Sequence, residues 1–137
     1  MKRRLPLATA ALLALPFAPA GLAADLDGSK PIICAPVEIK QCENHLNCES
    51  ETTDSVDMPQ FLVFSVADKT VTGTRPSGQA VNAKIDSVQH IDQQMYLQGV
   101  QKKLGWSAVI DETKGQMTLM VHDQGSGYVI FGACTPR

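Results

Sequence analysis

Apolar and polar residues alternate in short stretches along most of this chain, and polar turns separate the stretches at intervals of about ten to fourteen residues. In segment 79–88, for example, Val81, Ala83 and Ile85 fall on one face of an extended strand and polar residues fall on the other. The stretches are rich in β-branched and aromatic residues, and helical spacing is nearly absent. The pattern predicts an all-β fold.

The same pattern predicts eight strands, at residues 31–40, 60–66, 70–75, 79–88, 95–100, 106–110, 116–122 and 128–134. Most connections are short and contain turn-forming residues, such as Pro76 and Gly78. The long acidic segment 41–59 is the exception. Consecutive strands joined by tight turns form an antiparallel meander, and we expect this meander to roll into a small closed or nearly closed β-barrel.

Residues 1–23 do not follow the strand pattern. Lys2, Arg3 and Arg4 precede an apolar run that ends in small residues, which is typical of a secretory signal peptide cleaved after Ala23. We expect residues 24–137 to form a single domain that is periplasmic or secreted and has no membrane span after cleavage.

The exported part of the chain contains all four cysteines, Cys34, Cys42, Cys48 and Cys134. An even number of cysteines in a small exported domain indicates disulfides, and four cysteines allow three pairings. In a closed meander the first and last strands are antiparallel neighbours, which favours a Cys34–Cys134 disulfide at the seam and leaves Cys42 to pair with Cys48. In the loop-closure entropy model, a disulfide that closes a loop of about 100 residues stabilises the fold by roughly 4.7 kcal/mol.

Removal of the signal peptide makes the protein more acidic. The full chain has 12 basic and 14 acidic residues, and the loss of Lys2, Arg3 and Arg4 leaves nine basic residues and a formal net charge of −5. Because phosphate binding requires a basic surface, we expect no nucleic-acid partner. The acidic residues of segment 41–59 are interpreted as a solvated loop.

Two predicted strands are apolar on both faces, the stretches FLVFSV at 61–66 and YVIFGA at 128–133. A strand of an isolated barrel should instead alternate, with its outer face polar. Either the acidic segment or the mature N-terminus covers these outer faces, or the faces form an interface with a partner or a second copy.

No catalytic motif is present, and we expect no catalytic residue, metal or cofactor. Cys42, His45 and Cys48 contain the side chains that zinc prefers, but a second pair of ligands is absent and the spacing is not that of known zinc motifs. His90 and His122 are interpreted as surface residues. The interior of a small eight-stranded barrel is either filled by side chains or holds one small molecule, and the short strands favour a filled core.

Several segments of the chain resemble a group of small exported bacterial proteins of unknown function. They include LDGSKPIICA, PQFLVFSVADKTVTGTR, GWSAVIDETKGQMTL and the terminal VIFGACTPR. This resemblance covers nearly the whole mature chain. It implies an exported protein, with the periplasm of a Gram-negative bacterium as the compartment, and it implies no activity.

The sequence therefore predicts a non-catalytic binding or envelope-associated module of unknown specificity, whose partner is an envelope protein or a small ligand. One alternative is a carrier of a small apolar ligand. Another is a lysozyme inhibitor, because Ser126, Gly127 and Tyr128 resemble the inhibitory loop of small periplasmic barrels that inhibit lysozyme. In that alternative the three residues would form a protruding interaction loop.

Overall fold

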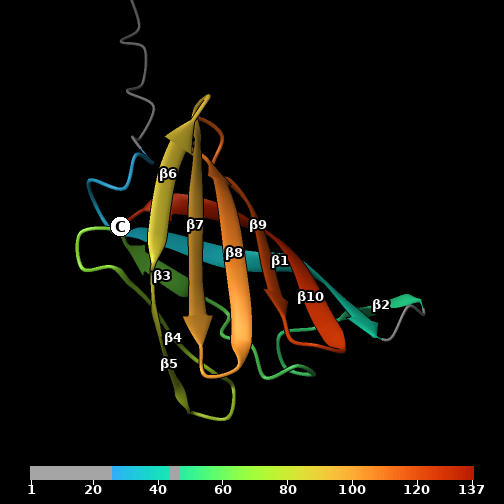
Figure 1. Ribbon diagram of the computed structural model, residues 1–137. Helices are drawn as coiled ribbons and strands as arrows, with labels where there is room; N and C mark the ends of the chain where they lie inside the picture. Colours follow the sequence, from blue (N-terminus) through green and yellow to red (C-terminus); the bar gives the residue numbers. More distant parts are fainter. Residues whose placement is uncertain (1–25, 44–46) are drawn as a thin grey trace, which may run out of the picture.

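The computed structural model describes residues 26–43 and 47–137, and within them it contains ten β-strands and no helix (Figure 1). The strands are β1 (Ile32–Glu43), β2 (Cys48–Glu51), β3 (Leu62–Ser65), β4 (Thr70–Thr74), β5 (Ala80–Lys84), β6 (Ser87–Ile91), β7 (Gln94–Gln101), β8 (Leu104–Asp111), β9 (Gln116–His122) and β10 (Ser126–Pro136). All neighbouring strands pair antiparallel. The all-β prediction is confirmed.

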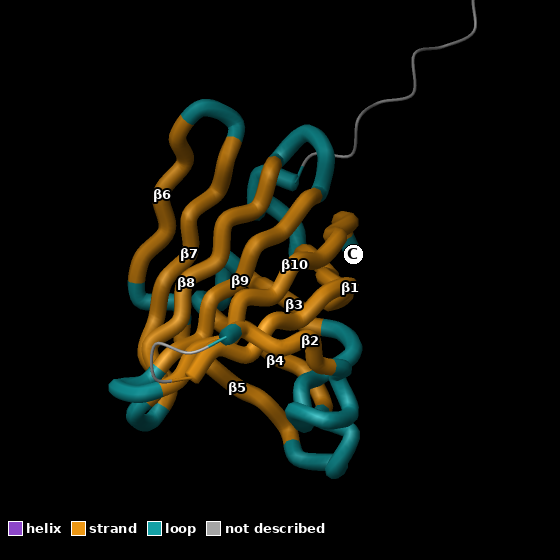
Figure 2. The backbone as a smooth tube through the Cα atoms, turned by 90° about the vertical axis from the view of Figure 1, so that its right-hand side faces the viewer, coloured by secondary structure: helices purple, strands orange, loops and turns teal. Residues whose placement is uncertain are grey.

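The described strands form one sheet that curls into a half-barrel (Figure 2). Nine of them follow one another in the order β5-β4-β3-β1-β10-β9-β8-β7-β6, and β2 pairs with the end of β1. β5 and β6 lie at the two ends of this order and do not pair with each other. The prediction was a closed or nearly closed barrel. Its closed form is not confirmed, because the sheet keeps two free edges at β5 and β6.

The predicted count of eight strands is wrong, for two reasons. Predicted strand 79–88 divides into β5 and β6 at Ile85 and Asp86, where the chain turns a corner. The alternation of apolar residues continues through buried Ile85, so the pattern gave no sign of this corner. In addition, segment 41–59 is only partly a loop, since it contains the end of β1 and all of β2.

Gly99 on β7 allows the corner to lie directly against the sheet. A Cβ atom at Gly99 would lie 2.2 Å from the carbonyl oxygen of Lys84. The backbone N–H of Asp86 donates to the Gln98 carbonyl (2.8 Å), and the Asp86 carboxylate accepts from the N–H of Val100 (3.2 Å). The corner is thus held against β7 by individual hydrogen bonds and not by a β-ladder.

The first and last long strands, β1 and β10, pair along their whole lengths. Cys34 lies opposite Cys134 in this ladder, and the two form a disulfide that joins positions 100 residues apart. This is the pairing that the meander favoured, because β1 and β10 remain neighbours in the half-barrel. A bulge in β1 leaves Val37 76% exposed.

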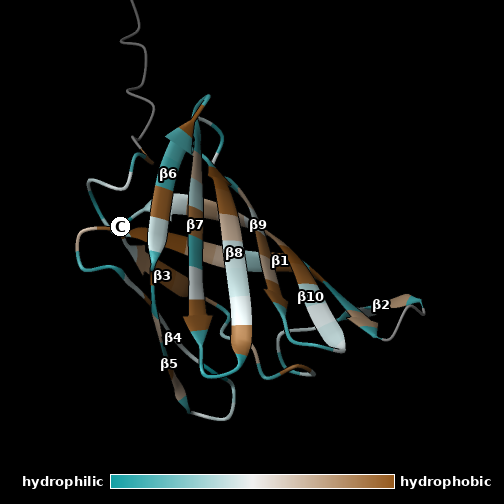
Figure 3. Ribbon diagram, viewed as in Figure 1, coloured by the Kyte–Doolittle hydropathy of each residue, from teal (hydrophilic) through white to brown (hydrophobic). Residues whose placement is uncertain are grey.

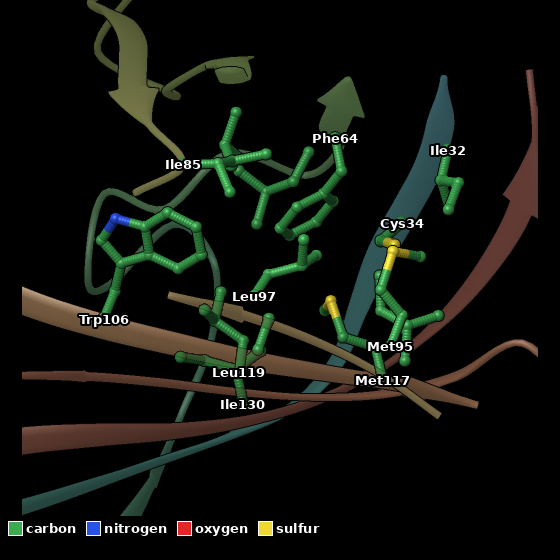
Figure 4. Packing of buried hydrophobic residues seen from close by; sticks show 14 of the residues in the cluster. Ile32, Cys34, Phe64, Ile85, Met95, Leu97, Trp106, Met117, Leu119 and Ile130 are labelled. Atoms are coloured by element: carbon green, nitrogen blue, oxygen red, sulfur yellow. The ribbon is translucent and has the colours of Figure 1, made fainter. Parts of the chain in front are cut away.

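One end of the half-barrel is filled, and we call it the closed end. Apolar residues recur along the strands (Figure 3), and Met95 and Met117 gather about Cys34 in the interior (Figure 4). Leu26 is 4% exposed and lies beside Gly115, at the turn between β8 and β9. The residues before β1 therefore plug this end.

The outer face of the sheet carries five apolar side chains on adjacent strands. This outer apolar patch consists of Tyr96, Val109, Met120, Val129 and Phe131. Tyr96 pairs with Val109, and Met120 pairs with Val129. Met120 is 45% exposed and Phe131 is 43% exposed. The described residues therefore leave the patch partly open to solvent, so they do not provide the cover that was one of the two expectations.

Candidate functional site

The end of the half-barrel opposite the plug contains a cavity of about 270 Å³, and we call it the open end. Arg75 after β4, Gln101 at the end of β7 and Leu104 at the start of β8 contribute to its wall, which places the cavity among the turns of that end. The predicted filled core is therefore right for the closed end and wrong for the open end.

Inward-facing residues of the two halves of the sheet form most of the cavity wall. Trp106 on β8, Leu119 on β9 and Tyr128 on β10 line one side. Phe64 on β3 and Ala83 on β5 are among the residues that line the other. Because side chains alternate along a strand, these are the same positions that the apolar pattern turns toward the interior.

The remaining wall comes from residues 52–59, which we call the strap. Val56, Met58 and Pro59 of the strap line the cavity. The strap lies in the acidic segment that the sequence pattern treated as a solvated loop, but its apolar residues face inward. The strap therefore works as a cover over the open end.

Hydrogen bonds from the turn after β4 hold the strap in place. Arg75 Nη1 donates to the backbone carbonyl of Asp57 (2.6 Å). The backbone N–H and the hydroxyl of Ser77 donate to the Asp57 carboxylate (2.9 and 2.8 Å). These bonds from Ser77, together with the nearby charge of Arg75, lower the pKa of Asp57 below its ordinary value. The contact is thus strongest when Asp57 is ionised.

Four polar side chains contribute to the cavity wall, those of Arg75, Gln101, Trp106 and Tyr128. Trp106 is 7% exposed, and in the described part of the chain its Nε1 has no hydrogen-bond partner. Figure 4 shows this nitrogen on the side of the ring that faces away from Leu97 and Leu119. Arg75 is the one charged residue among the described residues that line the cavity. The wall is therefore mostly apolar, with one cation and three neutral polar side chains.

The four predicted cysteines form the two expected pairs, Cys34–Cys134 and Cys42–Cys48. The second pair closes the hairpin between β1 and β2. No cysteine of the described residues is free. In residues 26–43 and 47–137, no group of three or more His, Cys, Asp or Glu side chains is arranged to hold a metal ion.

The Ser126–Gly127–Tyr128 tripeptide differs from the predicted protruding loop. It forms the start of β10, and Gly127 pairs with both Cys42 and His122. The Ser126 hydroxyl and backbone N–H donate to the Asp123 carboxylate (3.3 and 2.9 Å). Tyr128 turns inward and lines the cavity. The tripeptide is therefore part of the sheet that surrounds the open end.

His90 and His122 lie apart from the cavity wall. His90 lies on β6, and its Nδ1 contacts Oε1 of Glu112, the residue after β8, at 2.5 Å. The side chain of His90 is 46% exposed. The ring of His122 lies beside Gly105 on the neighbouring strand. His45 lies outside the described residues, as do the predicted signal peptide and its cleavage site.

Sequence reasoning missed the cavity because the short strands favoured a filled core. Two signals pointed toward the cavity. Trp106 lies opposite Gly99, whose missing side chain leaves room for the indole ring. Val56 and Met58 are apolar residues within an otherwise polar segment, which is more typical of a cover than of a free loop.

Comparison of the chain with protein-family models, with curated proteins and with solved structures found no match in any of the three. Among the described residues, no helix is long and apolar enough to cross a membrane. The two disulfides suggest an oxidising, non-cytoplasmic location. The cavity is therefore the feature from which a function has to be argued.

Proposed function

We propose that this protein is an exported, non-catalytic module that carries a small apolar molecule in the cavity at the open end of the half-barrel. The compartment is the periplasm or the extracellular space, which accords with the N-terminal signal pattern and with the two disulfides. The observation that carries the proposal is the cavity of about 270 Å³ that lies between the strap and the inner face of the sheet and is partly open to solvent.

The size of the cavity fits a small ligand. Pockets for drug-sized molecules span about 300–1,000 Å³, and an apolar cavity of about 150 Å³ is large enough to bind benzene. A void in a protein interior loses the dispersion contacts of the atoms that line it. A bound apolar molecule restores those contacts and leaves the aqueous phase at the same time.

The test blocks the cavity without changing the rest of the sheet. Ala83 lines the cavity and is 5% exposed, so A83F places a phenyl ring in the ligand volume. Asn82 is the next residue of β5 and is exposed, so N82F adds the same group on the opposite face. We expect A83F to abolish the binding of small apolar probes and N82F to retain it. Trp106 is the one tryptophan of the chain, so its fluorescence reports occupancy.

Two controls make this result decisive. Far-ultraviolet circular dichroism and non-reducing peptide mapping establish that A83F keeps the sheet and both disulfides. Wild-type protein that leaves Trp106 fluorescence unchanged across a series of apolar probes, and that carries no molecule in native mass spectra after purification from its own compartment, would refute the carrier function.

A second candidate function is attachment to an envelope partner through the outer apolar patch. The exposure of Phe131 and Met120 favours it, because contiguous exposed apolar side chains often mark protein interfaces. F131S is expected to weaken any association by the loss of this surface, while A83F leaves the association intact. Sedimentation analysis of the two variants, alone and with envelope extract, separates an outer interface from the cavity.

A further inference from the structure

We infer that the ligand of the cavity is an acidic amphiphile of the single-chain carboxylate class, with its apolar chain inside the cavity and its carboxylate at Arg75. This inference rests on the proposed carrier function and adds the chemical class of the ligand. The apolar wall accounts for the chain, and the guanidinium of Arg75 accounts for the head.

Arg75 is suited to receive the carboxylate. Its guanidinium carries five N–H donors, of which Nη1 is used by the Asp57 carbonyl. In the described part of the chain, none of the ion pairs includes Arg75. The Asp57 carboxylate is occupied by Ser77. The cation at the cavity wall is therefore held in position by the strap and lacks a direct carboxylate partner.

Trp106 does not decide the choice of head group. Its Nε1 has no partner among the described residues, but the atom has no accessible surface toward the cavity, so a bound ligand does not reach it.

The charge on the cavity wall predicts which head group an amphiphilic ligand should have. A cationic head would lie against Arg75 with no carboxylate of the described cavity wall to offset the repulsion. A neutral alcohol could accept a hydrogen bond but would forgo the stronger charge-assisted bond. The expected order of affinity for chains of equal length is carboxylate, then alcohol, then quaternary ammonium.

The experiment titrates the mature, disulfide-bonded protein with decanoate, decanol and decyltrimethylammonium, by calorimetry and by Trp106 fluorescence. We expect decanoate to bind about tenfold or more tightly than decanol, as one charge-assisted hydrogen bond requires. R75Q should remove this preference, and it should lower decanol affinity about as much as a loosened strap does, because Arg75 also donates to the strap.

A matched control separates the charge of Arg75 from its role in the strap. D57N weakens the contact of the strap with Ser77 and retains the guanidinium, so it should lower the affinity for decanol. Because it also removes a negative charge near Arg75, it should keep or raise the ratio of decanoate affinity to decanol affinity. If D57N and R75Q both lose the preference for decanoate over decanol to the same extent, Arg75 acts only by placing the strap. That result would overturn the inference.

The remaining outcomes also discriminate. Equal binding of decanoate and decanol to wild type, with both abolished by A83F, would reject the acidic class and retain the carrier function. Absence of binding by all three probes would reject the carboxylate inference, and the wider series of apolar probes then decides whether the carrier function survives.

Discussion

The two ends of this half-barrel are made from the same strands but are filled differently. At the closed end, Met95, Ile110 and Cys34 have no solvent exposure, and Leu26 plugs the gap between the turns. At the open end, the inward-facing residues surround a cavity of about 270 Å³, and a strap covers it. The contrast indicates a division of labour, in which the closed end stabilises the fold and the open end can accommodate a ligand at some expense of stability.

The largest expected effect is the loss of the disulfide at the closed end. Replacing Cys34 and Cys134 by Ala should lower the free energy of unfolding by about 4–5 kcal/mol, because the disulfide closes a loop of about 100 residues. That is a large share of the stability of a small domain. Urea denaturation measures the change. A loss no greater than that of the hairpin disulfide would contradict the assignment of stability to the closed end.

The next effect compares two neighbouring inward positions of β9. Met117 is 2% exposed in the filled interior, so M117A should cost about 2–5 kcal/mol. Leu119 lines the cavity, so L119A should cost less, because part of its surroundings is already empty. Denaturant midpoints of the two variants give the comparison. Equal costs would show that the two ends are packed alike.

A smaller effect is expected for the disulfide of the β1–β2 hairpin. Replacing Cys42 and Cys48 by Ala opens a loop of six residues, for which loop-closure entropy gives about 2.2 kcal/mol. The hairpin lies outside the cavity wall, so ligand affinity should not change. A large fall in affinity, measured by the same fluorescence titration, would show that the hairpin shapes the open end.

The smallest expected effect is a pH dependence of ligand binding, which should arise from a carboxylate at the open end and not from one at the closed end. The pKa of Asp57 lies below its ordinary value of 3.8, chiefly because Ser77 donates to it. The contact therefore contributes fully above about pH 4 and is lost as the pH falls through the lowered pKa. We expect acid to release the strap and weaken ligand binding, and D57N to bind weakly at every pH.

Asp111 provides the control for this acid effect. Its pKa is also lowered, first by the Thr113 hydroxyl and then by the N–H of Lys114, but it lies at the turn of the closed end. D111N should change stability without changing the pH dependence of binding. If D111N and D57N alter binding equally, the acid effect is global and does not arise from the strap.

Local pattern determined much of the fold. The alternation of apolar residues identified the strands 70–74 and 116–122 almost to the residue, and it identified the inward faces of the others. The order of the strands then placed the first beside the last, which favoured the pairing of Cys34 with Cys134. These features depend on short-range periodicity and on chain connectivity, and both can be read along a sequence.

The tertiary structure decided the closure of the sheet and the filling of its interior. Whether segment 79–88 continues or turns at Asp86 depends on the fit of Lys84 against Gly99, residues that lie 15 positions apart. The cavity depends on the curvature of the sheet and on where the strap crosses it. A cavity is a small difference between the volume enclosed by the backbone and the volume of the side chains, and periodicity along the chain reports neither quantity.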